Sequence, residues 1–144
     1  MTAKIGTFDV HAGTTIAEIL AAFESSDKDL LLVDECSVVT QPHLELLTDY
    51  PRTVTTALVT KVKGGLTRTS QGRITGATSG YHEVGHGNHT FLGIMRLSQF
   101  QREEIIEVLN KVKDTKHAGN AMDLVLVALV RAALVVAPAE VAGA

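Results

Sequence analysis

The chain has 144 residues, the length of one ordinary domain with a single hydrophobic core. Hydrophobic residues make up 45 % of it and charged residues 20 %, so the composition is that of a globular protein rather than a disordered or fibrous one. A net charge of -3 lacks the basic excess that nucleic-acid binding needs, and a single cysteine cannot form an internal disulfide. We therefore expect one cytoplasmic domain over residues 1–144, with no nucleic-acid partner.

Strand-like and helix-like patterns alternate in the first half of the chain. Thr15 and Glu18 have the spacing of a capping box, and the apolar residues after Thr15 recur at helical spacing. The continuous apolar run Leu30–Val33 is typical of a strand buried on both faces of a sheet. The expected elements are, in order, a strand at 4–10, a helix at 15–25, a strand at 30–33, a helix at 41–47 and a strand at 53–62.

The second half contains a hairpin pattern and a strongly apolar segment. Glycines and polar residues at 64–73 predict a hairpin-like excursion, which residues 74–78 complete. The elements expected after it are a strand at 90–97, a helix at 99–113 capped by Ser98, a helix from Ala121 and an apolar strand at 134–136.

Residues 121–138 are apolar enough to raise the question of a membrane span. Asp123 and Arg131 interrupt them, whereas a spanning helix needs roughly 20 nearly uncharged residues. We therefore expect a buried helix that leads into a strand.

The alternation of patterns indicates an α/β fold in which helices cover both faces of a sheet. Ligands bind such sheets outside the carboxyl ends of the strands, and Asp34, Glu35 and Cys36 directly follow the strand expected at 30–33. The two carboxylates offer the oxygen ligands that Mg²⁺ prefers when it bridges nucleotide phosphates, with an ordinary solvated turn as the alternative. Cys36 has no basic neighbour in the sequence, so we expect a buried, inert thiol.

A second candidate site is the string His82, Glu83 and His86, which has the spacing of zinc-dependent hydrolases. On a helix the two imidazoles would share one face around Zn²⁺, the glutamate would activate a metal-bound water, and His89 would offer a third ligand. The glycines within and around the string disfavour a helix. A glycine-rich loop is therefore favoured over a zinc site.

Three segments together resemble nucleotidyltransferase-like domains. Residues 30–52 resemble the strand, metal-binding turn and helix of these domains, residues 73–82 with 88–97 resemble a later stretch, and residues 123–131 resemble the closing helix. The likeness is to the N-terminal domain of actinobacterial proteins that join such a domain to a membrane CDP-alcohol phosphatidyltransferase. It implies a three-layer sandwich with a mostly parallel sheet, which binds a CTP-type nucleotide with Mg²⁺ at the strand ends.

The resemblance also assigns residues and shows where this chain departs from the family. It implies that Asp34 and Glu35 hold Mg²⁺ and that Asn88 contacts the nucleotide. The family's glycine-rich phosphate loop has no counterpart in the sequence, so the domain is expected to be incomplete at the N-terminus. Without a gap the family's metal-binding aspartate aligns with Cys36, and Asp34 takes its place if the turn is shifted.

We therefore expect a degenerate nucleotidyltransferase-like domain that acts as a non-catalytic binding or regulatory module in CDP-alcohol and phospholipid metabolism. Its expected partners are a CTP-type nucleotide, a membrane enzyme domain within a longer protein at the cytoplasmic face, and a second copy of itself. Two alternatives remain open. One is a zinc-dependent hydrolase that uses His82, Glu83, His86 and His89, and the other is a protein-interaction domain without a small ligand.

Overall fold

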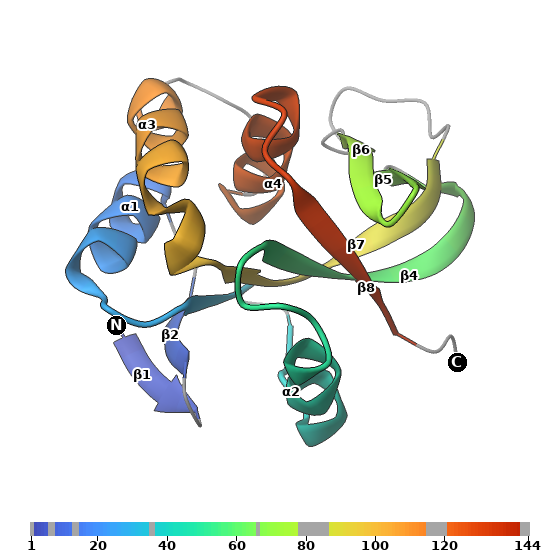
Figure 1. Cartoon of the computed structure of the whole chain (residues 1–144), viewed down its shortest axis with the longest axis horizontal. Helices are drawn as coiled ribbons and strands as arrows, with labels where there is room; N and C mark the ends of the chain where they lie inside the picture. Colours follow the sequence, from blue (N-terminus) through green and yellow to red (C-terminus); the bar gives the residue numbers. More distant parts are fainter. Residues whose placement is uncertain are drawn as a thin grey trace.

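A computed structural model of the chain describes residues 2–5, 8–12, 15–34, 37–65, 67–77, 87–114 and 121–141. Within these ranges helices and strands assemble around one sheet (Figure 1). The strands are β1 (Thr2–Ile5), β2 (Phe8–Ala12), β3 (Leu30–Val33), β4 (Thr55–Gly65), β5 (Thr67–Ser70), β6 (Arg73–Ala77), β7 (Gly87–Leu97) and β8 (Val136–Glu140). The helices are α1 (Ile16–Ser25), α2 (Gln41–Thr48), the short 3₁₀ helix η1 (Gln99–Gln101), α3 (Arg102–Val112) and α4 (Ala121–Arg131).

The sheet is mixed, and the expectation of a mostly parallel sheet is wrong. Its main path has the strand order β1-β2-β3-β7-β4-β8. Pairing is parallel between β2 and β3 and between β4 and β8, whereas β7 runs antiparallel to its neighbours β3 and β4, and β1 runs antiparallel to β2. The reason is the hairpin of β5 and β6, which stands between β4 and β7 in the chain. In the described part of this connection a hairpin stands between the two strands, and β7 lies beside β4 in the opposite direction.

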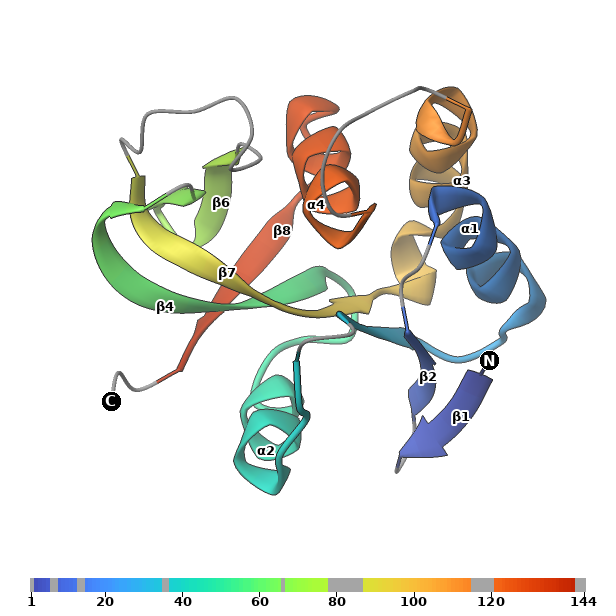
Figure 2. The same cartoon turned by 180° about the vertical axis from the view of Figure 1, so that it is seen from behind.

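Helices cover both faces of the sheet, as the alternation of sequence patterns predicted. Helices α1, α3 and α4 lie on one face and α2 lies on the other (Figures 1 and 2). Leu30 and Leu32 of β3 belong to the larger core beneath the three helices, while Leu31 belongs to the smaller core beneath α2. Strand β3 is therefore buried on both faces, which confirms the interpretation of its continuous apolar run.

Two local signals in the sequence are confirmed. The hydroxyl of Thr15 accepts a hydrogen bond of 3.1 Å from the backbone N–H of Glu18, so Thr15 caps α1. The predicted hairpin is formed by β5 and β6, and its turn residues Gln71 and Gly72 both have positive φ. This backbone conformation is the one that a tight two-residue hairpin turn requires.

Two expected elements differ from the structure. The single strand expected at 4–10 is two antiparallel strands, β1 and β2. The helix expected at 99–113 begins with η1, because the N–H of Gln101 bonds to the carbonyl of Ser98 and tightens the first turn before α3 starts. Among the described residues no helix is long and apolar enough to cross a membrane, and the apolar segment at 121–138 divides into α4 and β8.

A buried arginine joins α2 to the sheet. Arg96 of β7 is 1 % exposed. Its guanidinium donates hydrogen bonds to three backbone carbonyl oxygens and one hydroxyl, those of Leu47, Tyr50, Pro51 and Thr56. Asp29 is equally buried and lies 4.0 Å from Nε of Arg96, and it is also paired with the exposed Arg52 at 3.4 Å. The buried charge of Arg96 thus holds the C-terminal end of α2 and the segment after it against the sheet.

Replacing Arg96 should destabilise the protein far more than replacing Arg52. In Arg96→Met the three carbonyls lose their donor and Asp29 loses its buried partner, so we expect a loss of about 3–5 kcal/mol in the free energy of unfolding. Arg52→Met is the matched control, because it removes the exposed partner of the same carboxylate and should cost at most about 1 kcal/mol. Urea unfolding of both variants measures the difference, and equal losses would contradict the central role of Arg96.

Candidate functional site

The carboxyl ends of β3, β4 and β8 lie along one edge of the sheet, and the antiparallel strand β7 begins at the same edge. Asp34 directly follows β3, and Glu140 is the last residue of β8. His89 is the third residue of β7. Side chains with acid, base or metal-binding chemistry therefore gather at the edge where α/β sheets bind ligands.

The turn that carries Asp34 is held against β7 by hydrogen bonds. The backbone N–H of Asp34 donates to the carbonyl of Gly93 at 2.8 Å, and the hydroxyl of Ser37 donates to the carbonyl of Leu92 at 2.8 Å. The N–H of Ser37 donates to the carbonyl of Asp34 at 2.9 Å. The position of Asp34 is therefore fixed by its backbone and by the neighbouring strand.

Gly93 makes this close approach between the turn and β7 feasible. Its φ is +77°, and a Cβ atom at this position would lie 2.8 Å from both Cβ of Asp34 and Oγ of Ser37. Gly93 is also the middle residue of a bulge, since three residues of β7 stand opposite Leu58 alone between two regular pairs. A glycine is needed here for both its backbone conformation and its missing side chain.

Asp123 in the first turn of α4 is electrostatically linked to this strand end, and the sequence interpretation missed it. Burial raises the pKa of Asp123 above its ordinary value, and the negative charge of Asp34 raises that pKa further. In the sequence Asp123 served as an argument against a membrane span and as the first residue of the segment that resembles a closing helix, and no site role was assigned to it. An acidic residue inside an otherwise apolar helix was the signal that could have identified it.

The oxygen ligands at this strand end are of the kind that Mg²⁺ prefers. Mg²⁺ is commonly held by one or two carboxylates together with water and substrate phosphates, and Asp34 with Asp123 would supply such carboxylates. Over the described ranges, no three His, Cys, Asp or Glu side chains converge to hold an ion by themselves. Glu35, the other carboxylate predicted for Mg²⁺, lies outside the described residues, as does Cys36.

Asn88, predicted to contact a nucleotide, joins two strands within the protein. Its side-chain oxygen accepts a hydrogen bond from the N–H of Thr69 at 3.0 Å, and its side-chain nitrogen donates to the carbonyl of Thr69 at 3.3 Å. These bonds extend the pairing between β5 and β7. The nucleotide contact of Asn88 stays a prediction.

His89, the third ligand of the alternative zinc site, lies on a strand and is 6 % exposed. Its ring lies between Asn88 and Glu140. The other members of that site, His82, Glu83 and His86, lie outside the described residues. The zinc-hydrolase site therefore stays a prediction.

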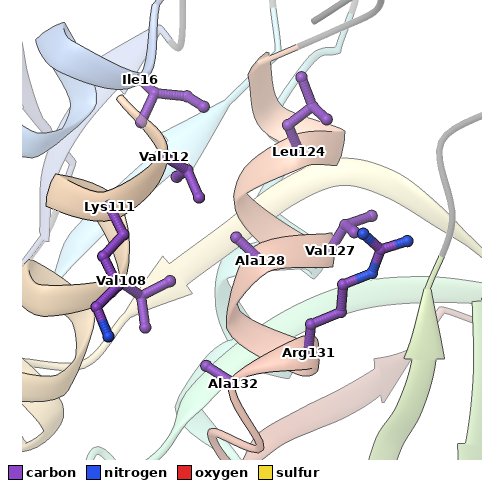
Figure 3. Close-up of a pocket in the computed structure, with 9 residues that line it drawn as sticks. All are labelled: Ile16, Val108, Lys111, Val112, Leu124, Val127, Ala128, Arg131 and Ala132. Carbon is purple, nitrogen blue, oxygen red and sulfur yellow. The ribbon is translucent and has the colours of Figure 1, made fainter. Parts of the chain in front are cut away.

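A separate groove of about 380 Å³ lies between α3 and α4. Apolar side chains such as Val108, Val112 and Leu124 line it, together with the cationic Lys111 and Arg131 (Figure 3). None of the residues that the sequence predicted for a site lines this groove. The groove and the strand-end carboxylates are thus built from different residues.

Comparison with known proteins identifies the fold. No family model matches the chain, and no curated protein sequence matches it. Among solved structures, the chain is similar to the inositol-1-phosphate CTP transferase from T. maritima, with a TM-score of 0.63 and 11 % sequence identity over 86 % of this chain. The match covers 50 % of that protein, so the chain spans about half the length of this structural neighbour. The structure therefore has a nucleotidyltransferase-like α/β fold, as the resemblance of the sequence implied.

Gly93→Ala should destabilise the protein by about 1–3 kcal/mol, because alanine is strained at a positive φ and its Cβ would collide with the Asp34 turn. Gly76→Ala in β6 is the matched control, since a Cβ there would meet only an ordinary contact at 3.7 Å. We expect it to change stability by less than about 0.5 kcal/mol. Thermal or urea unfolding of the two variants tests this, and a neutral Gly93→Ala would contradict the packing of the turn.

The raised pKa of Asp123 predicts a specific dependence of stability on pH. A carboxyl group with a raised pKa in the folded state favours folding fully below its unfolded pKa, and this contribution is lost as the pH rises through the folded pKa. Asp123→Asn removes this titration. As the pH rises from the unfolded pKa of the carboxyl through its folded pKa, the wild type should therefore lose stability relative to the variant. Urea unfolding at a series of pH values measures the difference. A difference that stays constant with pH would contradict the burial of this carboxyl.

Proposed function

We propose that this domain binds a CTP-type nucleotide with Mg²⁺ at the carboxyl ends of β3, β4 and β8, and that it acts as a binding or regulatory module rather than as a catalyst. Asp34 and Glu35 are the proposed metal ligands. The setting we propose is CDP-alcohol and phospholipid metabolism, with a membrane enzyme domain in a longer protein as a partner.

One observation carries the nucleotide proposal. Asp34 follows the buried strand β3, whose last residue is half-buried, at the ligand-binding edge of a fold that is shared with a CTP transferase. The hydrogen bonds to Gly93 and Leu92 fix its turn, so the carboxylate belongs to a rigid part of the sheet edge. Asp123, whose pKa is raised by burial and then by the charge of Asp34, would add a second carboxylate to this strand end.

The proposal of a non-catalytic role rests on the missing phosphate-binding chemistry. Nucleotidyl transfer depends mainly on holding the phosphates in line and neutralising their charge. The sequence has no Gly-x-Gly-x-x-Gly motif, and its Gly64–Gly65 pair lacks the Lys-Ser/Thr of a phosphate loop. The buried cation Arg96 is already committed to the carbonyl groups at the end of α2. The domain therefore has carboxylates for a metal ion but no sequence motif for a phosphate loop, which favours the binding of a nucleotide over its turnover.

The metabolic setting rests on two likenesses. The sequence segments at 30–52, at 73–82 with 88–97, and at 123–131 resemble domains that are joined to CDP-alcohol phosphatidyltransferases. The structural neighbour is named an inositol-1-phosphate CTP transferase. CTP is therefore the nucleotide to test first, with ATP and GTP as comparisons.

Asp34→Asn should weaken the binding of CTP at least about tenfold in the presence of Mg²⁺, because the amide keeps the shape of the side chain and removes its charge. Asp49→Asn is the matched control, since Asp49 is an exposed carboxylate at the C-terminal end of α2 on the opposite face of the sheet. Its affinity for CTP should equal that of the wild type. Titration calorimetry with and without Mg²⁺ gives both values.

Two results would contradict different parts of the proposal. Equal CTP affinities in the wild type and in Asp34→Asn would contradict the metal assignment, and the absence of CTP binding by the wild type would contradict nucleotide binding itself. Release of pyrophosphate from CTP in the presence of alcohol phosphates would contradict only the non-catalytic role.

A further inference from the structure

The imidazole of His89 is held in one orientation by the side chain of Asn88. The amide of Asn88 cannot be reversed, because its oxygen accepts from the N–H of Thr69 and its nitrogen donates to the carbonyl of Thr69. Nδ1 of His89 lies 3.0 Å from that amide oxygen and 3.2 Å from the hydroxyl oxygen of Thr69. The amide oxygen can only accept, so Nδ1 carries the proton in the bond between these two residues.

The other ring nitrogen of His89 faces a carboxylate without hydrogen-bonding to it. Nε2 of His89 lies 3.4 Å from Oε2 of Glu140, which is longer than a normal hydrogen bond between nitrogen and oxygen. With the proton on Nδ1, the Nε2 atom of a neutral imidazole presents its lone pair to the carboxylate. Two lone pairs at this distance repel each other unless a proton or a metal ion lies between them.

The distance between these two atoms is the one expected for two ligands of a single metal ion. Zn²⁺ binds imidazole nitrogen and carboxylate oxygen at about 2.0–2.2 Å, and two such ligands at a tetrahedral angle lie about 3.4 Å apart. Ligating histidines also commonly donate their other ring N–H to a neighbouring acceptor, which is what Nδ1 does toward Asn88. We propose that Nε2 of His89 and Oε2 of Glu140 bind a divalent transition-metal ion such as Zn²⁺, with Asn88 as the residue that positions the imidazole.

The surroundings of the pair fit such a site. His89 is almost fully buried, so its ring is rigid, while the side chain of Glu140 is 51 % exposed and leaves the ion a route from solvent. Nitrogen and oxygen ligands together suit Zn²⁺, Co²⁺ or Ni²⁺ rather than Mg²⁺. Two protein ligands leave at least two coordination positions to water or to an anion, one more than in zinc sites that have three protein ligands. This site uses none of the proposed Mg²⁺ ligands, so His89→Ala and Glu140→Gln test it separately from Mg²⁺ binding.

Titration of the metal-free protein with Zn²⁺, followed by calorimetry, tests the site. The wild-type chain should bind Zn²⁺, and Glu140→Gln and His89→Ala should each weaken this binding at least about tenfold. Asn88→Ala leaves both ligands in place and frees the imidazole, so a loss of about tenfold is expected there as well. His43→Gln and Glu45→Gln on α2 are the matched controls, because they remove an imidazole and a carboxylate outside the proposed site. Both should bind as the wild type does.

The protonation of the His89 ring gives a second readout that does not depend on variants. In the nitrogen-15 spectrum of the histidine rings, the metal-free protein should show His89 protonated at Nδ1, and Zn²⁺ should shift the signal of Nε2 alone. No Zn²⁺ binding by the wild type would overturn the proposal, as would an affinity that survives both His89→Ala and Glu140→Gln. A ring that stays protonated at both nitrogens when Zn²⁺ is added would identify the pair as a simple ion pair and overturn it too.

Discussion

The buried guanidinium of Arg96 is the constraint on which the arrangement of the layers depends. A charge that is 1 % exposed is tolerated only when acceptors surround it, and here three carbonyls, a hydroxyl and the carboxylate of Asp29 do so. Burial lowers the pKa of Arg96, while the charge of Asp29 opposes that effect. Arg96 belongs to β7, and its acceptors belong to α2, to the segment after α2 and to β4. One side chain therefore joins α2 and the segment after it to the sheet.

Residues shortly after Arg96 join α1, which lies on the opposite face of the sheet from α2, to the end of β7. Gln99 and Arg102 donate to the carbonyl oxygens at the C-terminal end of α1, including those of Phe23 and Ser26. Arg102 also lies over the ring of Phe23, 5.9 Å from its centre. The short segment from 96 to 102 thus supplies the donors for the last turns of two helices in different layers. Positive charge at these two helix ends opposes the negative end of each helix dipole.

The sequence allowed those parts of the fold to be predicted that depend on nearby residues. Thr15 caps α1, the run at Leu30–Val33 forms a buried strand, and the turn at Gly72 forms a hairpin, because each is decided within a few positions. The mostly parallel sheet was predicted wrongly, since the directions of its strands depend on connections that local pattern does not decide. Local pattern gave no reason to place a buried arginine in the middle of the sheet, because its acceptors come from residues 40 or more positions away.

For the candidate sites too, positions that depend on nearby residues could be predicted, and contacts between distant elements could not. The position of Asp34 at the end of a buried strand could be predicted, because the apolar run before it is recognisable in the sequence. The link between Asp34 and Asp123 could not, since it depends on how α4 packs above the sheet. The same holds for His89 and Glu140, which meet across β4 although they are far apart in sequence.

The bulge at Gly93 connects the two sites at this edge through the alternation of side chains. Three residues of β7 stand opposite one residue of β4, so the bulge inserts two extra residues, and an even number leaves each side chain on its original face. Phe91 therefore still faces the larger core with its partner Val59, and His89, two residues earlier, faces the same side. Glu140 pairs with Val59 in parallel register and shares that face as well. A bulge of one extra residue would have turned His89 to the face opposite Glu140. The bulge at Gly93 therefore both lets the Asp34 turn approach β7 and keeps the imidazole on the same face as the carboxylate.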